Sequence, residues 1–411
     1  MRIQRDLYLD KLIARKHNDM VKVVTGVRRC GKSYLLFELF MEHLIGSGVP
    51  RKRIIDVQLD DRKNKALRDP DACDAYVRER VGVGQHYVII DEIQLMPEFE
   101  DVLLGFLHIP NLDVYVTGSN SKFLSSDIIT EFRGRGDQVH VHPLSFSEYH
   151  AAMGRDWDDD WDDYMTYGGM PYAATLVDDR EKASYLQGLF EEVYLRDVID
   201  RHNVRNTGEL GELVDVVASA VGSLTNPDKL ERTFKTVKGA TLSAPTIRKY
   251  LGYFEDAFLI REVKRYNVRG RKYIGGPLKY YFEDVGLRNA RLNYRQQEPT
   301  HIMENIIYNE LVLRGYAVDV GIVELRKGDD RKQVEIDFVA NEGSKRYYVQ
   351  SAFVLADEEK RMQEERPLIS VPDSFKKIIV VGGSRKASRD DNGIVTMGIK
   401  QFLLNPDSLE L

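Results

Sequence analysis

A glycine-rich stretch between a predicted strand and a predicted helix constrains the fold of this 411-residue chain more than any other feature. The strand, residues 21–26 (VKVVTG), is rich in β-branched residues, and the helix (SYLLFELFMEHLIG) has apolar residues at helical spacing. The octapeptide GVRRCGKS spans their junction and fits the pattern G-x-x-x-x-G-K-[ST]. Its glycines let the backbone wrap a phosphate, which the N–H groups and the positive end of the helix dipole can bind. The spacing therefore predicts a phosphate-binding loop.

The loop predicts ATP and Mg²⁺ as cofactors. Lys32 is expected to reach the β- and γ-phosphates, and the Ser33 hydroxyl to ligate Mg²⁺. The residues expected to contact the nucleotide are Gly26, Val27, Arg28, Arg29, Cys30, Gly31, Lys32, Ser33 and Tyr34. The alternative, a glycine-rich turn with a chance lysine, is disfavoured by the strand and helix on the correct sides.

Two adjacent carboxylates end a second apolar run, YVIIDE (87–92). An unpaired buried carboxylate is costly, so acids at this place need a partner. Beside a phosphate loop, Asp91 can hold Mg²⁺ through water, and Glu92 can orient and deprotonate the attacking water. A kinase has less need of the second acid, so the pair favours hydrolysis over transfer. The alternative for Glu92 is a solvent-facing loop acid.

Two further segments offer candidate catalytic residues. The strand VYVTGSNSK ends in a polar cluster from which Ser119 or Asn120 could hydrogen-bond the γ-phosphate or the attacking water. A plain Ser/Asn turn is the alternative. In FRGRGDQ, Arg133 and Arg135 flank a glycine, and Arg135 is the candidate for completing the site of a neighbouring subunit. The alternative for this arginine is a local salt bridge.

The first third of the chain alternates strands with helices, which favours βαβ units and a mostly parallel sheet. The predicted strands are residues 21–26, 53–59, 87–92, 113–118 and 138–144. The acidic run 156–163 (DWDDDWDD) is predicted to be a solvated loop or linker. From His301 onward, a helix gives way to the strand-like segments VEIDFVAN, RYYVQSAFVL and KKIIVVGG, a second α/β segment.

Composition narrows the class of protein. The length predicts two to three domains. A net charge of −6 and a pI near 5.9 argue against indiscriminate coating of nucleic acid and leave room for a local basic patch. With only Cys30 and Cys73, neither a disulfide framework nor a zinc cluster is available. The N-terminus lacks a signal-peptide core and no apolar run reaches ~18 residues, which predicts a cytoplasmic protein with no membrane segment.

These motifs resemble a prokaryotic family of AAA+ ATPases whose core precedes a C-terminal region of unknown function. The matching segments, in order along nearly the whole chain, are GVRRCGKS, HYVIIDEIQ, TGSNSKFLSSDI, PLSFSEY, YGGMP, YLRDVI, KYYFEDVGLRNA and MENIIYNELVLRG. The resemblance implies an AAA+ fold related to origin-recognition-type ATPases. The expected domains are an ATPase core (1–150), a helical lid or linker region (151–209), a winged-helix-like domain (210–295) and a nuclease-like α/β domain (296–411).

The middle of the chain carries a candidate DNA-binding region. SAPTIRKYLGYFEDAFLI is predicted to be a helix, and a strongly basic stretch from Arg261 to Lys279 surrounds the hairpin VRGRKYIGG. Such a hairpin suits a wing that grips phosphates, while basic residues on the helix could enter a groove. The candidate contacts are Arg248, Lys249, Arg269, Arg271 and Lys272. A solvated hairpin, or a surface facing the acidic ATPase core, is the alternative.

The last third resembles the PD-(D/E)XK nuclease fold, in which acids from a helix and two strands surround Mg²⁺ beside a lysine. Three matching acids are Glu304 in the predicted helix and Glu335 and Asp337 in VEIDF. Gln350 stands where the next acid belongs, and Ala352 where the lysine belongs. Loss of a metal-holding carboxylate and of a stabiliser of the attacking hydroxide predicts that cutting activity is lost. Such a domain could still bind nucleic acid or mediate assembly.

The leading hypothesis is an ATP-hydrolysing AAA+ protein that acts on DNA as an oligomeric motor or remodeller. Its partners would be DNA and further copies of the chain, with sites near subunit boundaries. The alternative is a nucleotide-controlled switch that binds a protein partner and turns over slowly. Stimulation of turnover by DNA would distinguish the two hypotheses.

Overall fold

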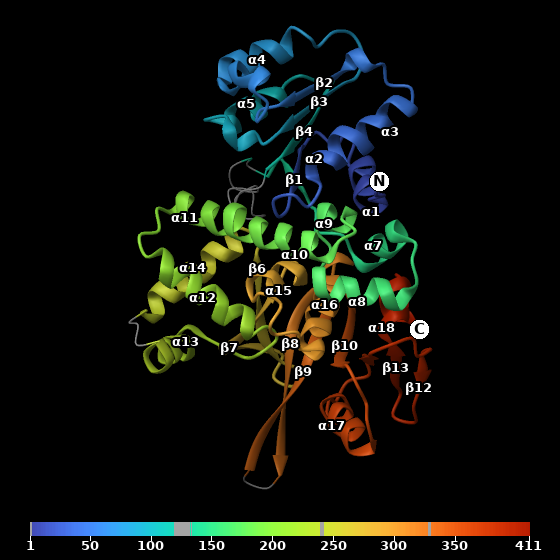
Figure 1. Cartoon of the computed structure of the whole chain (residues 1–411). Helices are drawn as coiled ribbons and strands as arrows, with labels where there is room; N and C mark the ends of the chain where they lie inside the picture. Colours follow the sequence, from blue (N-terminus) through green and yellow to red (C-terminus); the bar gives the residue numbers. More distant parts are fainter. Residues whose placement is uncertain (1, 119–131, 133, 239–241, 328–329) are drawn as a thin grey trace. The chain divides into compact units, whose positions relative to one another are not determined.

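The five strands predicted in the first third of the chain form one sheet (Figure 1). The computed structural model describes residues 2–118, 132, 134–238, 242–327 and 330–411. The chain divides into two units. Unit 1 comprises Met1–Pro143 with Asp256–Phe258, and unit 2 comprises Leu144–Glu255 with Leu259–Leu411.

Unit 1 contains a five-stranded sheet with the order β2-β3-β4-β1-β5. Its strands are β1 (Val21–Thr25), β2 (Ile54–Gln58), β3 (His86–Asp91), β4 (Leu112–Thr117) and β5 (Gly136–His140). Each neighbouring pair is parallel, which confirms the parallel sheet that the alternating pattern predicts. The carboxyl ends of all these strands therefore lie along one edge.

Helices lie on both sides of this sheet (Figure 1), because its strands are apolar on both faces. On one face Val23 of β1 belongs to a core with Val77 and Phe106. On the other face Phe40 packs on Tyr115, with ring centroids 4.6 Å apart. The helices are α1 (Asp6–Ala14), α4 (Pro70–Arg78), α5 (Phe99–Phe106) and a continuous helix of α2 (Lys32–Tyr34), a π-helical segment (Leu35–Phe40) and α3 (Met41–Gly46), with 3₁₀ turns at Arg51–Arg53, Arg62–Arg68 and Ile93–Leu95.

A buried ion pair joins β1 to β4. The ammonium of Lys22, which is fully buried, donates to the carboxylate of Asp113 and, at 3.1 Å, to Asn18 Oδ1. Asp113 also accepts a hydrogen bond from the Tyr115 hydroxyl at 2.9 Å. Either charge alone would be costly to bury, so each partner makes the burial of the other tolerable. The pair fixes β1, the strand that leads into the glycine-rich loop.

We expect Lys22→Met to destabilise unit 1 by about 3–5 kcal/mol, because it leaves the Asp113 carboxylate buried without its cation. The free energy of unfolding from urea titration measures this loss. The double variant Lys22→Met/Asp113→Asn is the matched control and should lose clearly less. Equal losses in the single and double variants would contradict a role for the charge.

Unit 2 begins with helices, and further helices lie between and after its strands. They are α7 (Phe146–Met153), α8 (Trp157–Tyr167), α9 (Pro171–Thr175), α10 (Asp179–Gly188), a π-helical segment (Leu189–Leu195), α11 (Arg196–His202), α12 (Thr207–Ser219), α13 (Pro227–Thr233), a second π-helical segment (Phe234–Lys238), α14 (Ala244–Asp256), α15 (Val285–Arg291), α16 (Pro299–Leu313), α17 (Glu358–Ile369), α18 (Ile399–Leu404) and a 3₁₀ turn (Ser408–Glu410). Within the described part of the chain, no helix is long and apolar enough to cross a membrane.

The prediction of a solvated loop at 156–163 is wrong, because this run opens helix α8. Trp157 and Trp161 lie one helical turn apart, are buried, and stack with ring centroids 5.7 Å apart. Asp160 is buried as well and accepts a hydrogen bond from Arg155 Nε at 2.8 Å. The acids that suggested a loop therefore stand at the N-terminus of a helix, where the helix dipole favours them.

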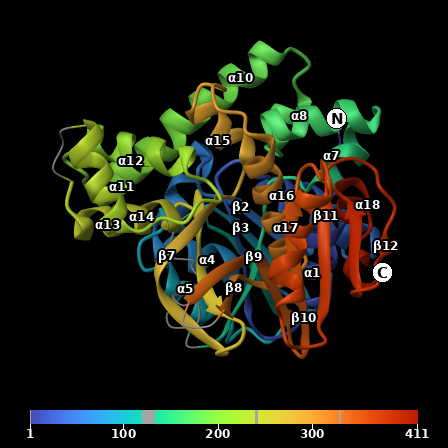
Figure 2. The same cartoon turned by 90° about the horizontal axis from the view of Figure 1, so that it is seen from below.

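An eight-stranded mixed sheet completes unit 2, from β7 at one edge to β12 at the other (Figure 2). The strands are β6 (Ile260–Asn267), β7 (Lys272–Phe282), β8 (Ala317–Lys327), β9 (Asp330–Glu342), β10 (Lys345–Ala352), β11 (Lys376–Val381), β12 (Ser388–Arg389) and β13 (Ile394–Gly398). Their order is β12-β13-β11-β10-β9-β8-β6-β7. The hairpin predicted as a wing, β6–β7, pairs with β8 and is therefore part of this sheet.

Candidate functional site

The glycine-rich loop follows β1 and passes through backbone conformations that favour glycine. The φ angle is +138° at Gly26, +63° at Arg29 and +99° at Gly31. A Cβ atom on Gly26 would lie 2.1 Å from the carbonyl oxygen of Val141, so both conformation and space demand glycine there. The loop leads directly into the helix that begins at Lys32. Its first N–H groups have no partner within the helix and suit an anion.

The ammonium of Lys32 lies inside the loop. The residue is 5% exposed, and Nζ donates to the carbonyls of Gly26 and Val27, both at 2.9 Å. The two hydrogen bonds hold the Lys32 ammonium inside the loop, where a phosphate would bind. Of the other predicted nucleotide contacts, Arg29 is exposed, Arg28, Gly31, Ser33 and Tyr34 are half-buried, and Cys30 is buried.

Asp91 comes close to the loop although β4 separates β3 from β1. The hydroxyl of Thr117, at the end of β4, donates to the Asp91 carboxylate, and the hydroxyl of Ser33 donates to it as well. Burial raises the pKa of the Asp91 carboxyl, and these two hydrogen bonds oppose the shift. The structure thus brings together Ser33 and Asp91, the two predicted Mg²⁺ ligands.

Glu92 stands at the same edge of the sheet in a left-handed conformation, with φ +52°. Its N–H donates to Thr117 Oγ1 at 2.9 Å, and its carboxylate accepts a hydrogen bond from Gln94. A positive φ at a residue other than glycine is strained and concentrates at functional sites. Thr117, which sequence reasoning placed only in a polar cluster, therefore positions both acids through one hydroxyl.

Residues near the N-terminus support the loop, and sequence reasoning missed them. Arg5, which is 3% exposed, donates to the carbonyls of Cys30 at 3.1 Å and His142 at 2.6 Å. The Tyr8 hydroxyl accepts from the His142 N–H at 3.1 Å, and Cys30 Sγ donates to the Val141 carbonyl at 3.3 Å. Arg5 gives no local signal for this role, because its acceptors lie 25 and 137 residues away along the chain.

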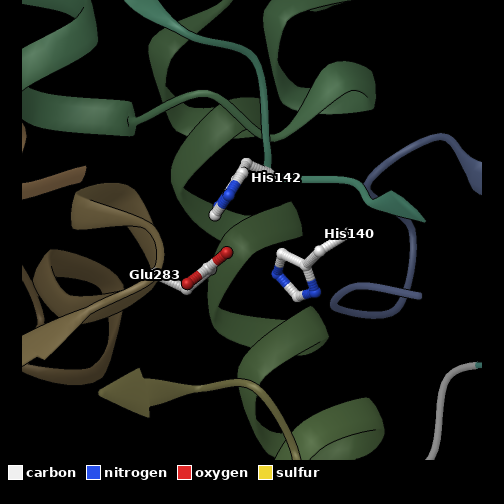
Figure 3. Close-up of side chains that lie close together, drawn as sticks. All are labelled: His140, His142 and Glu283. Atoms are coloured by element: carbon white, nitrogen blue, oxygen red, sulfur yellow. The ribbon is translucent and has the colours of Figure 1, made fainter. Parts of the chain in front are cut away.

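His140 ties the end of β5 to the end of β1, and His142 packs against it. His140 Nδ1 lies 3.1 Å from Thr25 Oγ1, and Gln138 Nε2 donates to the same hydroxyl at 2.8 Å. The rings of His140 and His142 lie edge to face, with centroids 4.6 Å apart (Figure 3). Glu283, drawn with them, belongs to unit 2. The contacts of Thr25 fix the residue directly before the glycine-rich loop.

Arg135 lies at the sheet edge opposite to the loop of its own chain. It is exposed, it directly precedes β5, and its carbonyl accepts from the N–H of Val21 at the start of β1 at 2.9 Å. Because β1 has five residues, about 16 Å of strand separate this edge from the loop. Ser119, Asn120 and Arg133 lie outside the described residues.

The predicted DNA contacts are Arg248, Lys249, Arg269, Arg271 and Lys272, and all are exposed. Arg269 also donates to the Ser370 carbonyl at 3.1 Å. Not every basic residue of the stretch is available, however. Arg265 is buried and donates to Gln333 at 3.2 Å. Lys279, counted with the hairpin in the sequence, is buried as well.

The carboxylates predicted from the nuclease-like pattern come together around Lys279. Its Nζ lies 2.8 Å from Glu304, 2.8 Å from Glu335 and 3.6 Å from Asp337. Lys279, which ends the basic stretch and is not one of the predicted DNA contacts, is therefore no part of an exposed basic surface.

A parallel sheet, a glycine-rich loop between β1 and a helix, and two acids at the end of β3 define a P-loop nucleotide-binding domain. Residues 18–150 match the family described as "AAA domain", and residues 158–298 match a "Domain of unknown function (DUF8612)". Residues 18–150 thus have the sheet and the phosphate-binding loop of an AAA domain.

Two relatives match over most of the chain. An "Uncharacterized protein" of Haemophilus influenzae is 32% identical over 409 residues, which cover 98% of this chain and 98% of that protein. The chain belongs to the family of this protein. "Uncharacterized protein MJ1544" of Methanocaldococcus jannaschii is 27% identical over 353 residues, covering 82% of this chain and 74% of that protein.

Solved structures align at lower similarity. The Aeropyrum pernix ORC1 protein in complex with DNA has 12% identity over 71% of this chain and 93% of that chain, with a TM-score of 0.28. A DNA polymerase III gamma subunit-related protein of Thermotoga maritima has 12% identity over 61% of this chain and 76% of that chain, with a TM-score of 0.29. Similarity at this level carries no argument about partners.

We expect Gly26→Ala to weaken ATP binding at least about tenfold, because forcing a side chain into this conformation costs on the order of 1–3 kcal/mol and displaces the loop. Titration with a fluorescent ATP analogue measures the affinity. Gly46→Ala is the matched control, since a Cβ there meets no atom within 4 Å. Wild-type affinity in the Gly26 variant would contradict nucleotide binding by this loop.

Proposed function

We propose that the protein binds ATP with Mg²⁺ and hydrolyses it. The observation that carries this proposal is the hydrogen-bonded link from Ser33 through Asp91 to Thr117. It places a hydroxyl and a carboxylate, the oxygen ligands that Mg²⁺ takes in nucleotide sites, beside the loop that holds Lys32. The AAA domain match over residues 18–150 supports the same proposal.

Glu92 is proposed as the general base. Its carboxylate follows Asp91 directly, and the bond from its N–H to Thr117 fixes its backbone at the edge where the loop lies. A base must hold the attacking water within hydrogen-bond reach of the γ-phosphate. Glu92 is suited to that task, because it follows Asp91, the proposed Mg²⁺ ligand, and its N–H is bonded to Thr117.

We expect Glu92→Gln to bind ATP normally and to hydrolyse it roughly 10²–10⁴-fold more slowly, because the amide keeps the size of the side chain and loses the base. Lys32→Ala should instead lose nucleotide binding. Release of phosphate and equilibrium binding of ATP, measured on both variants, separate the two effects. A normal rate in Glu92→Gln would move the catalytic role to another residue.

DNA is the proposed partner, and assembly into homo-oligomers is the proposed form. The exposure of Arg269, Arg271 and Lys272 at the β6–β7 turn supports contact with phosphates. Arg248 and Lys249 are exposed on α14 and are proposed to read base edges. Since Arg135 lies at the sheet edge remote from its own loop, it is proposed to act on the nucleotide of a neighbouring copy.

We expect alanine at Arg269, Arg271 and Lys272 together to weaken binding of duplex DNA of any sequence. Each lost phosphate contact should flatten the slope of log affinity against log salt by about 0.9. Fluorescence anisotropy at several salt concentrations measures that slope. A control variant that removes the same number of exposed charges has alanine at Arg51, Lys52 and Arg80.

The triple variant should keep its basal ATPase rate and lose any stimulation by DNA. Wild-type affinity and salt slope in that variant would contradict the DNA-binding hairpin. A wild-type ATPase rate that ignores single-stranded, duplex and branched DNA would favour the alternative, a switch that binds a protein partner.

A further inference from the structure

A buried lysine stands at the centre of the carboxylates in unit 2. Lys279 on β7 is 3% exposed, and its Nζ lies 2.8 Å from Glu304 Oε1 on α16 and 2.8 Å from Glu335 Oε1 on β9. Asp337 Oδ1, also on β9, lies at 3.6 Å. The three carboxylates thus converge on one cation from two different elements. Oxygen ligands that converge in this way are what a divalent metal such as Mg²⁺ or Mn²⁺ requires.

The surrounding structure holds the carboxylates in place. Glu304 accepts the Tyr281 hydroxyl at 2.5 Å, and Asp337 Oδ2 accepts the backbone N–H of Ser351 at 2.9 Å. Ile336 and Val339 of β9 pair with Gly321 and Asp319 of β8. Two residues separate the paired positions on β9, whereas one residue separates them on β8. The extra residue is a bulge, a device that re-aims side chains, and it falls at Asp337.

Gly321 on β8 pairs with Ile336, directly beside this bulge. A Cβ there would lie 2.8 Å from Val339 Cγ2 and 3.0 Å from Ile336 Cβ, so the glycine makes room for the bulged strand. The orientation of Asp337 toward Lys279 is therefore built into the backbone of the sheet. It does not depend on a chance rotamer of an exposed side chain.

The charge of Lys279 offsets part of the negative charge of the three carboxylates. Burial lowers the pKa of Lys279, but the three carboxylates outweigh it and raise the pKa above its ordinary value, so the ammonium is charged. One positive charge compensates fewer acids than a divalent metal does. Burial and the charge of Glu304 accordingly raise the pKa of Asp337 to about 7, whereas Lys279 holds the pKa of Glu304 below its ordinary value despite burial.

Gln350 and Ala352 complete this arrangement. The Gln350 amide accepts from the Asp337 N–H at 3.3 Å and donates to Glu364 at 3.0 Å, so its side chain serves the local hydrogen bonding. Ala352 is buried and brings no charge. Within the described residues, Lys279 is the one lysine or arginine paired with Glu304, Glu335 and Asp337.

We propose that Lys279 is the resident cation of a carboxylate site that would otherwise take a divalent metal. The native chain therefore excludes metal from this centre. The ammonium joins β7 to α16 and β9 where a metal would have activated water. This site lies in unit 2 and is independent of the proposed ATP hydrolysis in unit 1.

The test compares nucleotide-free wild type, Lys279→Met and Lys264→Met in Mn²⁺ titrations followed by calorimetry. Lys264 is the matched control, since it is exposed on the neighbouring strand β6. We expect Lys279→Met to gain a Mn²⁺ site at least about tenfold tighter than anything present in the other two proteins. Mn²⁺ should also raise the thermal stability of this variant alone, because metal binds its folded state. Identical titrations for all three proteins would overturn the proposal.

Two further variants keep the test decisive if Lys279→Met does not fold. Lys279→Met/Asp337→Asn carries less unbalanced charge and should still bind Mn²⁺ through Glu304 and Glu335; a folded double variant that binds none would overturn the proposal. Glu335→Gln in the wild-type background should leave the Mn²⁺ titration unchanged. Loss of a Mn²⁺ site in Glu335→Gln would show that the native centre already holds metal.

Discussion

The parallel pairing of β1 with both β4 and β5 is the constraint on which the nucleotide site depends. It brings the end of β1, where the loop starts, beside Thr117 at the end of β4 and beside the segment after β5. Gly26 can approach the Val141 carbonyl only because it has no Cβ, and Thr117 can bond Asp91 only because β3 is its other neighbour. The buried pair of Lys22 and Asp113 holds the same strands together from within.

Local sequence predicts the elements of this site better than their arrangement. The loop, the strands and the acids at 91 and 92 are local patterns of glycine spacing and β-branched runs, and the structure has them at the predicted places. No local sequence pattern predicts that β4 lies between β1 and β3, because long-range packing determines which parallel strands are neighbours. For the same reason the sequence gives no indication that Arg5 supports the loop.

Charged residues are where the predictions from sequence fail. The acids at 156–163 suggest a solvated loop, yet two tryptophans at helical spacing bury one face of the run. Lys279 appears in the sequence as one of several basic residues, yet it is buried in the sheet that β6–β7 joins through β8. In each case net charge describes the composition of a segment, whereas the period of its side chains decides which residues are buried.

Asp91 in unit 1 and Glu304 in unit 2 differ in the cations that we propose for them. Asp91 is bonded by the neutral hydroxyls of Ser33 and Thr117, which bring no positive charge, so the proposed Mg²⁺ would balance its charge when the nucleotide binds. Glu304 is bonded by an ammonium of its own chain, which balances the charge permanently. A site proposed to release its cation with each nucleotide cannot use the ammonium of a lysine, which stays attached to the chain. A site that holds strands together is stabilised by such a permanent cation. The two sites contain similar acids and differ in the groups bonded to them. These groups therefore distinguish the site at Asp91, proposed to exchange metal, from the site at Lys279, proposed to exclude it.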